Sequence, residues 1–172
     1  FAAEKLDELE AALDVGLSCD GGHRELRSMQ ASLWRRKGQF GEAKEALRKL
    51  LEEDASRSRD RLELARCHAE DGEDDEALKA LARVGDAYQA SLDEALFMAE
   101  CYRAAGDADK ARASLEGQEA EGEGAGSLLS LRGRISLDKG EGERAVELLQ
   151  KAREAGVADA SLLRSLGEAH VA

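Results

Sequence analysis

The chain has 172 residues, contains no proline and carries a formal net charge of -12 at pH 7. Its aromatic content is only 3%, and the abundance of Ala, Leu, Glu and Arg favours helices throughout. The negative charge argues against a nucleic acid or an anionic membrane as partner, because both attract positively charged surfaces. No apolar run approaches the ~20 residues of a membrane span, so membrane insertion is not expected.

The first predicted element is a helix over residues 1–17, followed by a connection to residue 23. Its apolar face is formed by Leu6, Leu9, Leu13 and Leu17. We interpret it as the second helix of a preceding helical hairpin. Complete hairpins are predicted at 24–57, 58–91, 92–125 and 126–159, followed by a first helix at 160–172. Both ends therefore look cut from a longer array, and such uncapped ends favour self-association.

A period of 34 residues organises these hairpins. Glycines recur at this spacing at Gly38, Gly72, Gly106 and Gly140. The same spacing relates an alanine set and a leucine set, namely Ala43, Ala77, Ala111 and Ala145, and Leu47, Leu81, Leu115 and Leu149. Small residues precede the glycines at Ala31, Ala65, Ala99 and Gly133, and continue at Gly167. Each glycine suits a helix end with positive φ, and the small residues let two helices of about a dozen residues pack closely.

Two local signals refine the boundaries. Ser91 and Glu94 match the S-x-x-E capping box, which marks a helix start. The second helix of the third hairpin is expected to fray near Gly117, and the polar, glycine-rich residues 117–126 are expected to form a mobile connection.

The turn motifs "GQFGEA" at 38–43, "GEDDEA" at 72–77 and "GDADKA" at 106–111 resemble those of the tetratricopeptide repeat family. The large aromatic position of that family corresponds to Trp34 and Tyr102, with His68 and His170 in the same register. Ser136 replaces the aromatic residue in the fourth hairpin, and the family's usual proline is missing. The resemblance implies an all-α fold, a right-handed superhelical solenoid of antiparallel helical hairpins.

In the family, the first helices line a concave groove. The register carried over from it places a set of polar side chains toward that groove: Arg35, Arg66, Arg103, Arg134, Arg164, Ser28, Ser32 and Glu100, together with Asp138. The planar guanidinium of arginine suits carboxylates, including those of an acidic peptide. The alternative is that these arginines pair with acids on neighbouring helices and only solubilise the surface.

The function expected from this resemblance is a protein–protein interaction scaffold whose groove binds a peptide segment, with an acidic one favoured. Two alternatives remain open. One is a structural spacer that oligomerises by end-to-end stacking, and the other is a regulatory docking module of a larger enzyme. A cytoplasmic location is favoured over the bacterial periplasm, in which members of the family also work.

Catalysis, cofactors and metals are not expected. The sequence has no G-x-S-x-G elbow and no Ser/His/Asp set. Cys19, Asp20 and His23 lack a fourth metal ligand. Cys67 and Cys101 occupy an apolar register and are expected to be buried core thiols.

Overall fold

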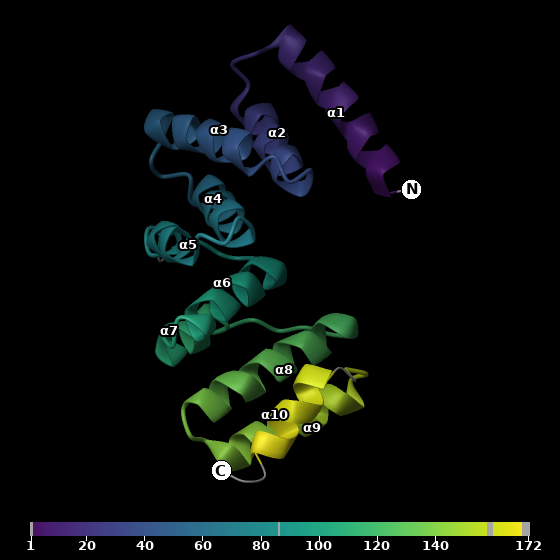
Figure 1. Ribbon diagram of the computed structural model, residues 1–172, viewed down its shortest axis with the longest axis vertical. Coiled ribbons are helices and arrows are strands. Elements are labelled where there is room, and N and C mark those ends of the chain that lie inside the picture. The colour runs from purple at the N-terminus through teal and green to yellow at the C-terminus, as the bar shows by residue number, and fades with distance from the viewer. Residues whose placement is uncertain (1, 86, 158–159, 170–172) are drawn as a thin grey trace. The chain divides into compact units, whose positions relative to one another are not determined.

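The computed structural model describes residues 2–85, 87–157 and 160–169, and every regular element within these ranges is an α-helix (Figure 1). The contacts divide the chain into two compact units, Phe1–Tyr88 and Gln89–Ala172. Each unit is built from helices that pack against their neighbours in the chain. The predicted all-α class and the 34-residue period are confirmed.

The first unit contains two helical hairpins preceded by a single helix. Its elements are α1 (Ala2–Cys19), α2 (Arg24–Arg36), α3 (Phe40–Glu53), α4 (Ser58–Glu70) and α5 (Asp74–Leu81). Helices α2 and α3 form one hairpin, α4 and α5 form the next, and α3 packs against α4. A buried cluster joins the two hairpins and includes Ala31, Ala43, Leu47, Leu64 and Cys67. The core of this unit therefore lies between successive hairpins, as the sequence period predicts.

The second unit contains two helical hairpins followed by a single helix. Its elements are α6 (Leu92–Ala104), α7 (Ala108–Ser114), α8 (Glu123–Asp138), α9 (Gly142–Glu154) and α10 (Ala160–Ala169). Helices α8 and α9 lie side by side, and α10 packs against both (Figure 1). Leu149, Ala152, Leu162 and Leu166 form the buried cluster that holds these three helices together.

The turn glycines have the conformation that the sequence predicts. The φ angles of Gly38, Gly72, Gly106 and Gly140 lie at 75°, 79°, 80° and 73°. In each turn the residue after the glycine donates its main-chain N–H to a carbonyl five residues earlier, as Glu73 does to His68 at 2.8 Å. This bond closes the end of the first helix, and only glycine adopts the required φ without a steric cost.

Helix lengths depart from the prediction in the second and third hairpins. Helix α7 ends at Ser114, well before Gly117, and α5 also ends early at Leu81, so these second helices are shorter than a dozen residues. Helix α8 begins at Glu123, inside the stretch predicted to be a connection. Gly126 explains this early start, because it is buried against Val157 and Ala155 and its packing holds the first turn of α8 in place. The capping box at Ser91 is confirmed.

Candidate functional site

The first helices of the first unit, α2 and α4, face each other through a ladder of polar side chains. Arg35 Nε donates to Glu63 Oε2 at 3.2 Å, and the Arg35 guanidinium also contacts Glu70. Ser32 Oγ donates to the same Glu63 oxygen at 3.1 Å. Ser28 donates to Asp60. The polar residues predicted on α2 therefore share one face, and their partners lie on the next first helix.

Arg35 is largely enclosed by these contacts, with only 10% of its side chain exposed. Burial by itself lowers the pKa of Arg35, but the charges of Glu63 and Glu70 outweigh it, and the net pKa is raised. Arg66 on α4 lies on the other side of the same carboxylate, with Nε 3.8 Å from Glu63 Oε1. Glu63 thus lies between two of the predicted arginines.

The first helices of the second unit, α6 and α8, carry the corresponding arrangement. Arg103 Nη2 lies 3.0 Å from Glu100 Oε1, and Arg134 Nη1 lies 3.2 Å from the same oxygen. Arg103 also reaches Asp138 on α8 at 3.4 Å. Burial raises the pKa of Glu100, but the hydrogen bond from Arg103 and the charges of Arg134 and Arg103 outweigh it. The net effect lowers the pKa of Glu100, so this carboxylate is ionised at neutral pH.

A hollow of about 250 Å³ lies beside the Glu100–Arg134 pair. Its apolar lining comes from Leu96 on α6, Leu131 on α8 and Val157 after α9, and Ser127 and Ser130 complete it. The guanidinium Nε of Arg134 is buried and has no hydrogen-bond partner among the residues that the structure describes. The hollow therefore combines apolar walls with a charged edge that has a hydrogen-bond donor to spare.

The predicted site residues thus divide by unit. Ser28, Ser32, Arg35 and Arg66 come together on α2 and α4, and Glu100, Arg103 and Arg134 come together on α6 and α8. Arg164 lies on α10 and is exposed. The alternative raised from the sequence, that the arginines pair with acids on neighbouring helices, describes Arg35, Arg103 and Arg134. An acid of the same unit therefore offsets the positive charge of each of these three side chains.

The acidic partners of these arginines and the apolar walls of the hollow are not evident from the motifs of the sequence. A signal for the ion pairs was present in the spacing, because partners on adjacent first helices must be separated by about one repeat. Arg35 and Glu70 are 35 residues apart, and Glu100 and Arg134 are 34 apart. No spacing in the sequence indicates the hollow, because it depends on how completely neighbouring residues bury each apolar side chain.

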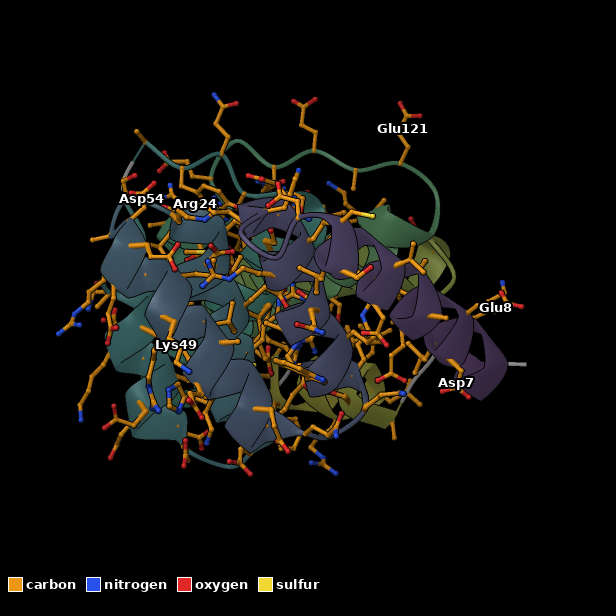
Figure 2. All side chains as sticks on the ribbon, turned by 90° about the horizontal axis from the view of Figure 1, so that it is seen from above. Asp7, Glu8, Arg24, Lys49, Asp54 and Glu121 are labelled. Atoms are coloured by element: carbon orange, nitrogen blue, oxygen red, sulfur yellow. The ribbon has the colours of Figure 1, made fainter. Side chains whose placement is uncertain are left out.

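The remaining surface is strongly charged. Asp7, labelled in Figure 2, points away from the ribbon of α1 into solvent, and Lys49 on α3 is exposed as well. Their exposed fractions are 71% and 61%. Over the described part of the chain, no group of three metal-ligating side chains comes together, and no helix is long and apolar enough to cross a membrane. Cys67 is fully buried, and Cys101 is only half-buried.

The fold and this polar face define a helical-repeat protein of the solenoid class. The tetratricopeptide repeat family matches residues 35–96 in sequence. None of the curated proteins matches the chain. The solved structures similar to it include tetratricopeptide repeat proteins, and the chain shares their fold.

Three of these structures show how similar the chain is to solved proteins in sequence and fold. A tetratricopeptide repeat protein from Parabacteroides merdae is 24% identical with a TM-score of 0.58, and the alignment covers 97% of this chain and 66% of that one. MamA is 21% identical with a TM-score of 0.69, covering 90% of both chains. The Cut9–Hcn1 hetero-tetramer of the APC/C is 17% identical with a TM-score of 0.68, and the alignment covers 98% of this chain and 34% of that one. The chain spans less than two thirds of the first and third of these proteins.

Proposed function

We propose that the first-helix face of the second unit, formed by α6 and α8, binds a peptide segment of a protein partner. Tetratricopeptide repeats generally mediate protein–protein interactions and are generally non-enzymatic scaffolds. The single observation that carries the proposal for this chain is the hollow between α6 and α8. Its walls of Leu96, Leu131 and Val157 suit one apolar side chain of a bound segment, next to the Glu100–Arg134 pair.

An acidic segment is favoured over a basic one at this hollow. Glu100 is the acceptor for both Arg103 and Arg134, and Arg134 Nε has no acceptor among the described residues. The Arg134 side chain is 24% exposed and lines the hollow, so its guanidinium is available to a carboxylate or carbonyl of the partner. The positive charge of the face is largely compensated within the chain, so we expect the salt dependence of binding to be modest.

Assembly with another protein is also a property of one structural neighbour, since the Cut9–Hcn1 structure is a hetero-tetramer. The proposal for the present chain is limited to its own first-helix face. A docking module of a larger enzyme would use this face in the same way.

A photo-crosslinking experiment tests the proposed function. The full chain carries a benzophenone side chain in place of Leu96, which is half-buried in the hollow, or in place of Gln150, which is exposed on α9 as a matched control. We expect protein adducts that form from position 96 and not from position 150. The same adducts should be lost in Arg134→Glu and kept in Arg153→Glu, an exposed arginine on α9. Equal adducts from both positions would contradict the proposal.

Self-association is a second candidate function, and Leu163 supports it. This leucine on α10 is 59% exposed, and its neighbours Ser161 and Arg164 are exposed as well. Packing of this side chain against a second copy would remove its apolar surface from water. Sedimentation of the full chain tests this candidate, because Leu163→Lys should shift the protein to monomer if α10 forms the contact. An unchanged sedimentation coefficient would argue against it.

A further inference from the structure

A second pocket lies in the second unit, away from the hollow described above. Its volume is about 420 Å³, and its lining comes from α7, the turn after α7, α8 and α9. Leu115, Ile135 and Leu148 supply apolar walls, and Arg112 and Arg144 lie at its edge. Ser136 also lines the pocket, with only 2% of the residue exposed. Its hydroxyl makes no hydrogen bond within the described part of the chain.

Ser136 occupies the position at which the other repeats carry a ring. Counting back in steps of one repeat gives Tyr102, His68 and Trp34. Local structure supports the equivalence, because the carbonyls of Ser136, Tyr102 and His68 each accept the N–H of the residue five positions later, at 2.8, 2.9 and 2.8 Å. A serine side chain is much smaller than a ring, so the pocket exists where the chain itself lacks ring atoms.

The charged residues beside Ser136 are of the same type as those beside the ring of Tyr102. Lys110 Nζ lies 5.6 Å from the centre of the Tyr102 ring, a cation–π distance. Arg144, at the edge of the pocket, follows Ser136 by the same eight residues by which Lys110 follows Tyr102. The acids correspond too, since Asp107 pairs with Lys110 at 2.8 Å and Glu141 pairs with Arg144 at 3.5 Å.

The first unit supplies a second comparison. The buried His68 ring contacts Glu73, and Glu73 also accepts from Lys44 Nζ at 2.8 Å. Two repeats later, Arg112 Nη2 donates to Glu141 Oε2 at 2.6 Å beside Ser136. The charged pair is therefore kept, while the ring that it borders is replaced by a serine and a pocket.

We propose that this pocket binds an aromatic side chain of a protein partner, which takes the place of the ring that Ser136 lacks. The walls are apolar, the guanidinium of Arg144 borders the pocket as a cation–π partner, and the Ser136 hydroxyl supplies a hydrogen bond to a phenol. A volume of roughly 150 Å³ is enough for benzene in a cavity lined by aliphatic side chains. The larger volume here leaves room for the main chain that carries the ring.

The ring site is tested with p-cresol, the side chain of tyrosine, titrated into the full chain and followed by amide chemical shifts. We expect shifts at the amides of Leu115, Ile135, Ser136 and Leu148. Ser136→Tyr places a ring in the pocket from within, so it should abolish the shifts and raise the thermal midpoint. Gln150→Tyr, on the exposed side of α9, is the matched control and should leave the shifts unchanged.

Two further arms separate a ring site from a general apolar pocket. The aliphatic analogue 4-methylcyclohexanol should bind more weakly than p-cresol, because it has no π face for Arg144. Arg144→Gln should remove this difference, whereas Arg153→Gln should keep it. Equal binding of the two probes to the unaltered chain, or p-cresol shifts that survive in a folded Ser136→Tyr variant, would overturn the proposal.

The protein source of the ring is tested by selecting displayed random peptides on the full chain. Peptides that bind the unaltered chain and are lost with Ser136→Tyr should contain an aromatic residue. If these peptides lack one, or if p-cresol binds but no displayed peptide depends on Ser136, the partner is not a protein ring and the proposal fails. Variants at Arg134 leave this pocket intact, so the outcome is independent of the first-helix face.

Discussion

Gly133 and Leu149 pack so closely that a Cβ atom on Gly133 would lie 2.6 Å from Leu149 Cγ. Gly133 belongs to the register of small residues that includes Ala31, Ala65 and Ala99, all fully buried. Alanine fits in those three repeats, whereas in the fourth the leucine of the second helix takes the space. The contact is between α8 and α9, so it fixes how closely that hairpin closes.

We therefore predict that Gly133→Ala destabilises the chain by about 1–3 kcal/mol, because the added methyl overpacks the α8–α9 contact. Gly167→Ala is the matched variant in the same register, since a Cβ there would meet no described atom within 4 Å. It should be neutral or stabilise the chain by up to about 1 kcal/mol through helix propensity. Thermal unfolding followed by circular dichroism measures both. Equal effects of the two variants would show that Leu149 moves away from the added methyl group without a loss of stability.

Gly133 and Gly167 both belong to a register of small residues that is evident in the sequence. The turn glycines and the small-residue register reflect local sterics. Their recurrence every 34 residues, as at Gly38 and Ala43, was therefore sufficient to predict the hairpins. The early start of α8 was missed because Gly124 and Gly126 disfavour a helix locally. Packing of Gly126 against Val157 determines where α8 begins, and the sequence around these two residues does not indicate that they are in contact.

The arginines of the first helices show what the sequence could not reveal about the candidate site. Arg35, Arg103 and Arg134 were placed on the first helices correctly. Their ion-pair partners lie about one repeat away on the adjacent first helix. The position of each arginine within its own helix therefore could not identify these partners. The ring pocket was visible only as the departure at Ser136, because a missing ring leaves a cavity only if neighbouring side chains do not fill it.

Lys44 joins the two hairpins of the first unit, and we predict that Lys44→Gln weakens that junction. Its Nζ donates to Asp71 Oδ2 at 2.6 Å and Glu73 Oε2 at 2.8 Å, and only 10% of the side chain is exposed. Two charge-assisted bonds on an enclosed lysine should contribute about 1–2 kcal/mol. Lys49→Gln removes an i,i+4 pair with Glu45 from a side chain that is 61% exposed.

The Lys49 variant should cost less than about 0.5 kcal/mol, as is usual for an exposed helical pair. Urea unfolding of both variants, compared with the unaltered chain, gives the two differences. If Lys44→Gln cost no more than Lys49→Gln, the junction would depend on apolar packing alone.

The Cys67 thiol is predicted to be unreactive in the folded chain. Burial raises its pKa to about 12, so at pH 8 only about one molecule in ten thousand carries the reactive thiolate. Cys19 is exposed at the end of α1 and serves as the internal control. Iodoacetamide labelling followed by mass spectrometry should modify Cys19 in native buffer and Cys67 only in denaturant. Labelling of Cys67 at the rate of Cys19 would indicate frequent opening of the α2–α4 core.

The pH dependence of stability should carry a contribution from Glu100 in the second unit. Its folded pKa lies below the ordinary value of 4.5, because Arg103 and Arg134 favour the ionised carboxylate over the effect of burial. A carboxyl group with a depressed folded pKa stabilises the fold at pH values above its unfolded pKa, and this stabilisation is lost as the pH falls through the folded pKa. The window of loss therefore begins near pH 4.5 and extends below it.

Glu100→Gln should lower the thermal midpoint at pH 7, and its difference from the unaltered chain should shrink as the pH falls from 4.5 toward the folded pKa. Glutamine keeps the shape of the side chain and removes the titrating charge, so the other carboxylates cancel in the comparison. Glu143→Gln, on the exposed side of α9, is the control and should give a small difference that does not vary with pH. A difference for Glu100→Gln that stays constant through this window would mean that the two arginines do not depend on its charge.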